Sequence, residues 1–352
     1  MRGRKFLVYL LSLALIIIAV LTYDALVPGK QAQIGMTLHY RGADPASIRR
    51  QFDLMAAMKV NWIRVDIDWS AIESERGEFD WSYSDLIVDE AAARKMNVLG
   101  VLGFTPTWAR TSASSDSANP RHFRPDDLAH YANFARLAAE RYAPEGVHSW
   151  EIWNEHNTSK FWPPLPDANE YGQLFRGAAT AIRSVDVTAT LLIGGLGPQY
   201  EEPGAEIPPT TYLEQLYDNG TAQLADGIAS HPYSFPALPA YTSPQPVGGF
   251  KDLPKLHAVM AEHGDGHKKI WITEFGAPTG TDPWAVSEEC QAVALLQARQ
   301  QVARWDWTGP LIFYELVDGG DDPADKEQNF GVLREDLSPK PSAIALTDIA
   351  PS

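Results

Sequence analysis

The sequence has 352 residues, with 45 Asp and Glu against 29 Lys and Arg, so its formal net charge at pH 7 is -16. Such an acidic balance argues against a nucleic-acid partner, because neutralising phosphates requires clustered Lys and Arg. The single cysteine, Cys290, excludes an internal disulfide and a zinc site built from several cysteines. The common nucleotide-binding, serine-hydrolase and zincin motifs are also missing from the sequence.

The first 30 residues differ in character from the rest of the chain. Arg2, Arg4 and Lys5 precede an uncharged apolar stretch at residues 6–23. At about 1.5 Å per residue, a helix over this stretch spans roughly 27 Å, close to the thickness of the hydrocarbon core of a membrane. No small-residue cleavage site follows, so we expect residues 1–23 to be a signal anchor, with a cleaved signal peptide as the alternative.

This interpretation predicts the location of the protein. Because basic flanks stay on the cytoplasmic side, the remainder of the chain would lie outside the cytoplasm, anchored to the membrane or, after cleavage, secreted. Residues 24–32 then form a linker, and residues 33–352 form one domain.

From residue 33 onward, strand patterns alternate with helix patterns. Eight strands that alternate with helices predict a closed (β/α)8 TIM barrel. The alternative, an open doubly wound sheet, would usually show fewer units and a glycine-rich first turn. The expected strands are residues 33–40, 61–69, 97–104, 148–155, 190–196, 227–232, 269–274 and 310–316, and the expected helices are residues 46–58, 83–95, 125–142, 168–185, 212–219, 253–263 and 287–305.

Two glutamates lie where predicted strands end. Glu155 belongs to the sequence WEIWNEHN at the end of the fourth strand, and Glu274 to WITEFG at the end of the seventh. The strand ends of a barrel meet at its catalytic face, so these carboxyl groups are expected to face each other across its mouth. Glycoside hydrolysis needs such a pair, one carboxyl protonated and the other charged. The alternative is that both are ordinary solvated charges at strand ends.

The alternation within strands predicts an ion pair beneath these glutamates. Arg64 and Asp66 share one face of the second strand with Asp68, opposite Ile63 and Val65. In the fourth strand Glu151 shares a face with Trp153 and Glu155. Charges that point into a barrel must be paired, so we expect Arg64 to pair with Glu151.

The two glutamate motifs resemble those of the clan A glycoside hydrolases, which are retaining (β/α)8 enzymes. The details are most similar to family 39 and the cellulase-like branches, including bacterial exopolysaccharide endoglycosidases, and the resemblance covers about residues 33–316. Two places depart from it: His156, where many relatives have proline, and the eighth strand, which offers Tyr314 and Glu315 where relatives often have tryptophan. The other supporting residues are His39, Arg64, Pro106, Trp108, His231 and Tyr233.

The resemblance implies a role for each matching residue. Glu155 would be the acid/base, Glu274 the nucleophile, and Asn154 a hydrogen-bond partner of the sugar 2-hydroxyl. Tyr233 or His231 would hold Glu274 in position. The remaining substrate-binding residues would be His39, Arg64, Trp108 and Tyr314, with Trp108 stacking on a sugar ring unless it packs in the core.

The sequence thus predicts a retaining glycosidase that acts on an extracellular or cell-envelope polysaccharide without a cofactor or metal. Two alternatives remain open at this point. One is a transglycosylase that uses the same site. The other is a non-catalytic carbohydrate-binding protein of the cell envelope.

Overall fold

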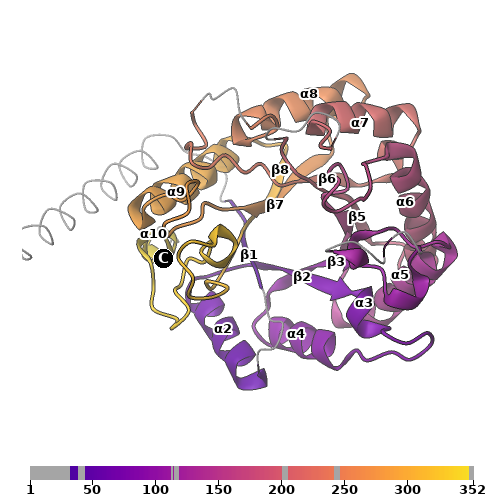
Figure 1. Ribbon diagram of the computed structural model, residues 1–352, viewed down its shortest axis with the longest axis horizontal. Coiled ribbons are helices and arrows are strands. Elements are labelled where there is room, and N and C mark those ends of the chain that lie inside the picture. Colours follow the sequence, from indigo (N-terminus) through magenta and orange to yellow (C-terminus); the bar gives the residue numbers. More distant parts are fainter. Residues whose placement is uncertain are drawn as a thin grey trace, which may run out of the picture.

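The computed structural model describes residues 32–38, 44–111, 114, 119–199, 205–241 and 246–348. Eight parallel strands close a barrel in chain order, with the last strand beside the first (Figure 1). The predicted (β/α)8 barrel is therefore confirmed. Its strands are β1 (Ile34–Thr37), β2 (Trp62–Asp68), β3 (Asn97–Gly103), β4 (Ser149–Asn154), β5 (Thr190–Leu196), β6 (Gly227–Ser230), β7 (Lys269–Phe275) and β8 (Thr308–Phe313).

The helices form a ring around the strands (Figure 1). The predicted helix at residues 125–142 begins only at Leu128, because the Asp127 side chain caps it by accepting from the Ala129 N–H. The α-helices are α2 (Pro45–Ala57), α3 (Trp69–Ile72), α4 (Ser82–Ala93), α5 (Leu128–Tyr142), α6 (Ala168–Arg183), α7 (Pro209–Asp218), α8 (Leu253–Glu262), α9 (Glu288–Arg304) and α10 (Pro341–Asp348). The sequence did not predict the short α3 or the terminal α10, which packs against α9.

Two predicted features lie outside the described residues. The predicted anchor and most of the linker fall within residues 1–31, and His39 falls within residues 39–43. Among the residues that the structure describes, no helix is both long and apolar enough to cross a membrane.

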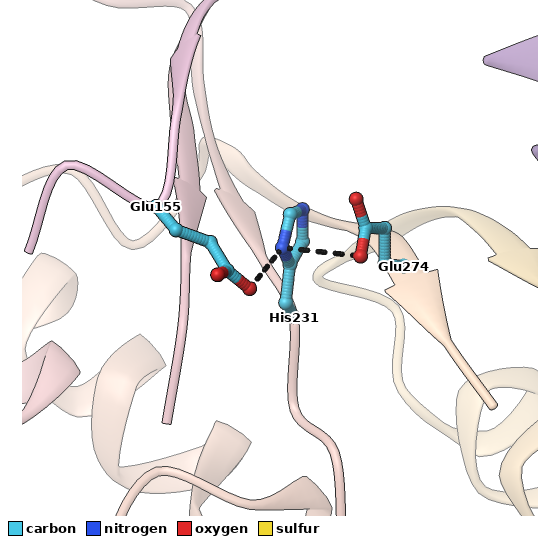
Figure 2. A group of neighbouring side chains, drawn as sticks. All are labelled: Glu155, His231 and Glu274. Atoms are coloured by element: carbon cyan, nitrogen blue, oxygen red, sulfur yellow. Dashed lines mark hydrogen bonds and ion pairs between the residues drawn. The ribbon is translucent and has the colours of Figure 1, made fainter. Parts of the chain in front are cut away.

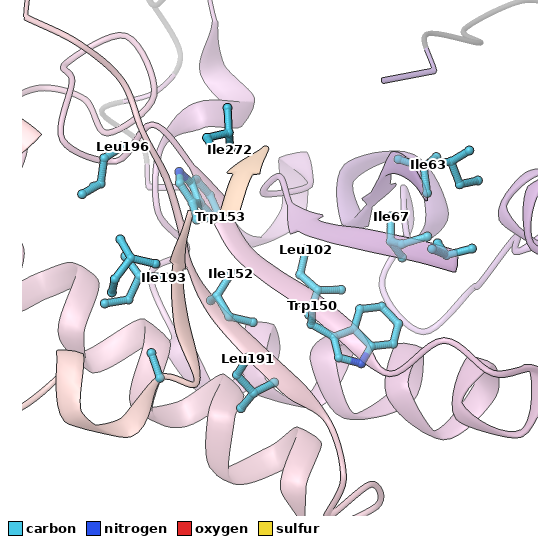
Figure 3. Close-up of a cluster of buried hydrophobic side chains, with 14 of the residues drawn as sticks. Ile63, Ile67, Leu102, Trp150, Ile152, Trp153, Leu191, Ile193, Leu196 and Ile272 are labelled. Carbon is cyan, nitrogen blue, oxygen red and sulfur yellow. The ribbon is translucent and has the colours of Figure 1, made fainter. Parts of the chain in front are cut away.

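The apolar core has a larger and a smaller part among the strands and helices, and a separate third cluster contains Tyr233, Phe235, Ala277, Ala294 and Phe330. The larger part fills the space between strands and helices, with side chains such as Ile63, Leu102 and Ile152 fully buried (Figure 3). The smaller part contains Leu99, Leu192, Ala229 and Ile312 and packs against Trp62 and Trp271. It joins side chains of β3, β5, β6 and β8, which meet inside the barrel as layered inward side chains do in this fold.

The end of β4 departs from regular strand geometry. Trp153 and Glu155 have positive φ angles of 69° and 40°, in the region that residues other than glycine rarely adopt. Trp153 consequently packs outward against Tyr131 of α5, and not on the inner face with Glu151 as the alternation predicted. Asn154 and Glu155, in contrast, both line the mouth of the barrel. The local twist thus delivers two adjacent side chains to one site.

Candidate active site

A cleft of about 490 Å³ opens at the ends of the barrel strands. Its lining includes Glu155 and Glu274 together with four other predicted site residues, Arg64, Asn154, Tyr233 and Tyr314. Arg64 lies within β2, Asn154 and Glu274 lie at the ends of β4 and β7, and the other three follow β4, β6 and β8. The fold therefore brings together residues that the sequence separates widely.

The two glutamates lie on either side of His231 (Figure 2). The His231 Nδ1 atom is 2.9 Å from Glu155 Oε1 and 3.5 Å from Glu274 Oε2. One oxygen of each carboxyl group and one His231 nitrogen all lie within 4.8 Å of one another. Retaining glycosidases hold their two carboxyl groups about 5–5.5 Å apart, whereas inverting enzymes leave a wider gap for water. With one oxygen of each group this close, the two carboxyl groups can flank a single glycosidic bond.

Arg64 connects the catalytic face to the charged layer beneath it. Its guanidinium is buried and donates to Glu151 Oε2 at 2.8 Å, Glu274 Oε1 at 2.6 Å and Asn154 Oδ1 at 2.8 Å. The predicted Arg64–Glu151 ion pair is confirmed. Burial opposes the charge of Arg64, but Glu151 and Glu274 outweigh it and hold its pKa above the ordinary value.

Glu151 is the completely buried partner in this layer. Besides Arg64, it accepts from the Gly195 backbone N–H at 2.7 Å. Burial alone would raise its pKa, but the charge of Arg64 and the contact with His231 lower the pKa of this carboxyl to about 2. Glu151 is therefore ionised at neutral pH, which suits a structural role rather than proton transfer.

Tyr233 and His231 restrain the two candidate catalytic groups. The Tyr233 hydroxyl donates to Glu274 Oε2 at 2.7 Å, as the family resemblance implied. His231 is fully buried and hydrogen-bonds Glu155 more closely than Glu274. Although burial lowers the pKa of His231, the charge of Glu274 and the contacts with Glu151 and Glu155 raise it to about 9. His231 is thus protonated at neutral pH.

The trio Glu155, His231 and Glu274 also has the spacing of a metal site. A metal ligand must offer an unprotonated nitrogen, however, and a charged imidazole donates from both nitrogens. In this structure the His231 Nδ1 atom lies 2.9 Å from Glu155 Oε1, so the imidazole and this carboxyl group hydrogen-bond directly to each other.

The sequence analysis did not identify two residues that shape the surroundings of the cleft, Asn157 and Gly195. Asn157 is buried, donates to the Gly197 and Ile207 carbonyl oxygens and accepts from the Gly197 N–H. Gly195 passes so close to His231 that a Cβ at this position would lie 2.0 Å from Nε2. The sequence offered a weak signal only for Gly195, a glycine inside a strand, which often marks close approach of another group.

The structure does not place Trp108 in the cleft. Its indole N–H donates to the Glu73 carbonyl oxygen at 2.8 Å, and its ring meets Trp69 edge to face, 5.6 Å away. The segment after β3 turns Trp108 toward α3, where its ring packs on Trp69. Tyr314 does line the cleft, where it meets Tyr233 and Phe330 edge to face. The other aromatic residues of the lining are Phe104, His122, Phe161 and Phe235.

A sequence profile described as cellulase (glycosyl hydrolase family 5) matches residues 27–309, well over half of the chain. The chain belongs to the cellulase family. This membership confirms the predicted relationship to the clan A glycoside hydrolases. A search of curated proteins finds no match to the sequence.

Several solved structures share this fold. A family 39 enzyme from the gut symbiont Bacteroides cellulosilyticus WH2 is 23% identical, with a TM-score of 0.70 over 91% of this chain and 64% of that one. A monomeric beta-xylosidase from Caulobacter crescentus CB15 is 19% identical, with a TM-score of 0.68 over 91% and 68%. Xylanase B from Clostridium stercorarium F9 is 15% identical, with a TM-score of 0.57 over 90% and 97%. This cellulase-family chain thus spans less than two thirds of the family 39 structure.

Proposed function

We propose that this protein is a retaining glycoside hydrolase that cleaves O-glycosidic bonds by double displacement. The observation that supports this most strongly is the spacing of Glu155 and Glu274, whose nearest carboxylate oxygens and His231 lie within 4.8 Å of one another. Glu274 is the nucleophile and Glu155 the general acid and base.

The surroundings of Glu274 suit a nucleophile. Arg64 and Tyr233 each donate to a different oxygen of its carboxylate, at 2.6 and 2.7 Å. Charge-assisted hydrogen bonds of this kind stabilise the ionised form and fix the direction of the attacking oxygen. Glu274 then attacks the anomeric carbon, the bond to the leaving oxygen breaks, and a glycosyl ester forms on Glu274.

The surroundings of Glu155 suit proton transfer. Its side chain is 17% exposed, whereas that of Glu151 is fully buried, so Glu155 reaches both substrate and water. It first gives its proton to the leaving oxygen and later removes a proton from the water that cleaves the ester. The His231 Nδ1 atom hydrogen-bonds Glu155 Oε1 at 2.9 Å and positions this carboxyl group in both steps.

The proposed substrate is an extracellular or cell-envelope polysaccharide, reached from a membrane anchor at residues 1–23. This part of the proposal rests on the apolar stretch and its basic flank in the sequence. Full-length protein should partition with membranes, and N-terminal sequencing should find the first residues still attached. A mature chain that begins near Ala25 would instead identify a cleaved signal peptide and a secreted enzyme.

Trapping of the glycosyl ester tests the proposed reaction. A 2-deoxy-2-fluoro glycoside with a good leaving group slows the second step, so the sugar should accumulate on the protein. Mass spectrometry of peptides should find it on Glu274, and a Glu274→Gln variant should remain unlabelled. A label on another residue, or rapid turnover of aryl glycosides by Glu274→Gln, would contradict the assignment.

A further inference from the structure

The end of the barrel opposite the cleft carries exposed apolar side chains. All eight strands are parallel, so the turns that lead from a helix into the next strand gather at that end. Val185 and Val187 lie in the turn before β5, and Leu224 lies in the turn before the neighbouring β6. Val187 is 80% exposed, more than any other large apolar side chain that the structure describes. Neighbouring apolar side chains that stay in water often mark a contact surface.

Four of the described tryptophans lie at the same end. Trp62 begins β2, Trp271 is the third residue of β7, and Trp305 and Trp307 precede β8. Each is half-buried, so each stays partly exposed. Tryptophan, with an apolar ring and a polar N–H, is the side chain that proteins favour where a membrane meets water.

The charge at this end suits a lipid surface. The turns between helices and strands are residues 58–61, 94–96, 143–148, 184–189, 219–226, 263–268 and 305–307. They contain four Lys and Arg against five Asp and Glu, so they are nearly neutral although the whole chain has a net charge of -16. Because anionic lipids repel acidic groups, this end meets less repulsion at such a surface than the rest of the chain does.

The chain also enters the barrel at this end. The predicted anchor ends at residue 23 and β1 begins at Ile34, so ten residues join them. The start of β1 is held in the barrel, since the Gln33 carbonyl oxygen accepts from the Leu311 N–H and the Ile34 carbonyl oxygen from the Asn61 N–H. Ten residues span at most about 36 Å when fully extended. This tether keeps the end of the barrel where β1 begins close to the bilayer.

We propose that the end of the barrel around Val187 and Leu224 rests on the headgroup region of the membrane, so that the catalytic cleft opens away from the bilayer. The inference rests on the anchor in the proposed function. It deepens that function, because a cleft that faces away from the bilayer is reached by a polysaccharide outside the membrane and not by a glycolipid within it.

The test reads the surroundings of single side chains in the full-length protein on vesicles of phosphatidylcholine and phosphatidylglycerol. The exposed Cys290 is first removed by Cys290→Ser. An environment-sensitive fluorophore is then attached to Val187→Cys, Leu224→Cys or Leu165→Cys. Leu165 is the matched control, because it is 58% exposed but lies between β4 and α6, at the cleft end of the barrel.

Two quenchers report where each fluorophore lies. A spin label on the lipid chains should quench the probes at the Val187 and Leu224 positions, since apolar groups at an interface lie about 5–10 Å into the boundary between headgroups and chains. Iodide in the water should quench the probe at the Leu165 position strongly and the other two weakly. Equal iodide quenching at all three positions on vesicle-bound protein, or lipid quenching at the Leu165 position alone, would overturn the inference.

A charged variant separates contact through this surface from tethering alone. Val185→Asp combined with Val187→Asp places two charges where the membrane would lie, and charges are costly to remove from water. In this variant, iodide quenching at the Leu224 position should rise to the level seen at the Leu165 position. The matched Leu165→Asp should leave the Leu224 probe protected. Full protection of this probe in the charged variant would contradict the proposed contact.

Sedimentation of the same vesicles keeps this inference distinct from the proposed function. If the protein stays in the supernatant, the proposed anchor fails and this inference fails with it. If the protein sediments with the vesicles but the Val187 and Leu224 probes remain as open to iodide as the Leu165 probe, the anchor stands and this inference fails alone. Turnover of aryl glycosides by the same samples tests the proposed hydrolysis separately.

Discussion

Gly195 illustrates how a single backbone position controls the site. Its carbonyl oxygen accepts from the Glu155 N–H, its own N–H donates to Glu151, and no room exists for a Cβ beside His231. Gly195→Ala should displace His231 and lower kcat about 100-fold or more, since displacing catalytic groups by about 1 Å has effects of this size.

Gly177→Ala is the matched control for this prediction. A Cβ at Gly177, within α6, would meet Ala132 at 3.6 Å, an ordinary contact. This variant should retain activity and gain about 0.5–1 kcal/mol of stability, because alanine favours a helix interior. Full activity in Gly195→Ala would show that the position of His231 does not matter for turnover.

Trp108 and Phe161 should respond oppositely to truncation. Trp108 packs on Trp69 and bonds to the Glu73 backbone outside the cleft, whereas Phe161 lines the cleft and stacks on His122 at 4.5 Å. Trp108→Ala should lower the free energy of unfolding by about 2 kcal/mol and leave kcat/KM nearly unchanged. Phe161→Ala should raise KM for oligosaccharides more than it lowers the thermal midpoint. The reverse pattern would restore Trp108 as a sugar contact.

At the level of elements, β2, β4 and the segment after β6 share one buried charged layer that makes stability depend on pH. The pKa of His231 rises from an ordinary 6.5 to about 9 on folding. The contribution of His231 to the free energy of unfolding is therefore fully present below about pH 6.5 and is lost as the pH rises through about 9. On folding, the pKa of Glu151 falls from 4.5 to about 2. Its contribution to the free energy of unfolding is therefore present above pH 4.5 and is lost as the pH falls through about 2.

Thermal unfolding between pH 3 and 10 checks this dependence. The midpoint should decline from about pH 6.5 to 9, and His231→Asn should show a flatter profile over that range. His148, which pairs with Asp186 outside the cleft, provides the control, and His148→Asn should keep the decline. A midpoint that rises between pH 7 and 9 would contradict the protonation assigned to His231.

The strands, and the face of each strand on which a side chain lies, were the most predictable part of the molecule. The alternation in β2 placed Arg64 toward Glu151, because a regular strand exposes every second side chain to the same face. The same rule was wrong for Trp153, since positive φ angles at Trp153 and Glu155 interrupt the alternation. Such local backbone conformations depend on contacts with β5, including the Glu155 N–H to the Gly195 carbonyl oxygen, and a single sequence does not reveal them.

Segments outside the strands were less predictable. Pro106 and Trp108 matched the family pattern, yet the loop path, and not the motif, decides whether an aromatic ring enters the cleft. Asn157 is the last residue of the WEIWNEHN motif, but its role depends on Gly197 and Ile207, which lie 40 and 50 residues further along the chain. Tertiary contacts at this distance leave no periodic signal in the sequence.

For the molecule as a whole, the barrel explains how one chain assembles a two-carboxylate site. Apolar side chains fill its interior, Arg64 and Glu151 form the layer above them, and Glu155, Glu274 and Asp66 line the mouth. The central claim is that Glu274 forms a glycosyl ester and that Glu155 supplies and removes protons.

Azide rescue tests this claim most directly. In Glu155→Ala, an activated aryl glycoside should still form the ester on Glu274, because its leaving group needs no proton, but hydrolysis of the ester should stall. Azide needs no general base, so it should restore turnover and release a glycosyl azide of retained anomeric configuration, identified by NMR. Rescue of Glu274→Ala but not of Glu155→Ala, or a first product of inverted configuration from the parent, would contradict the account.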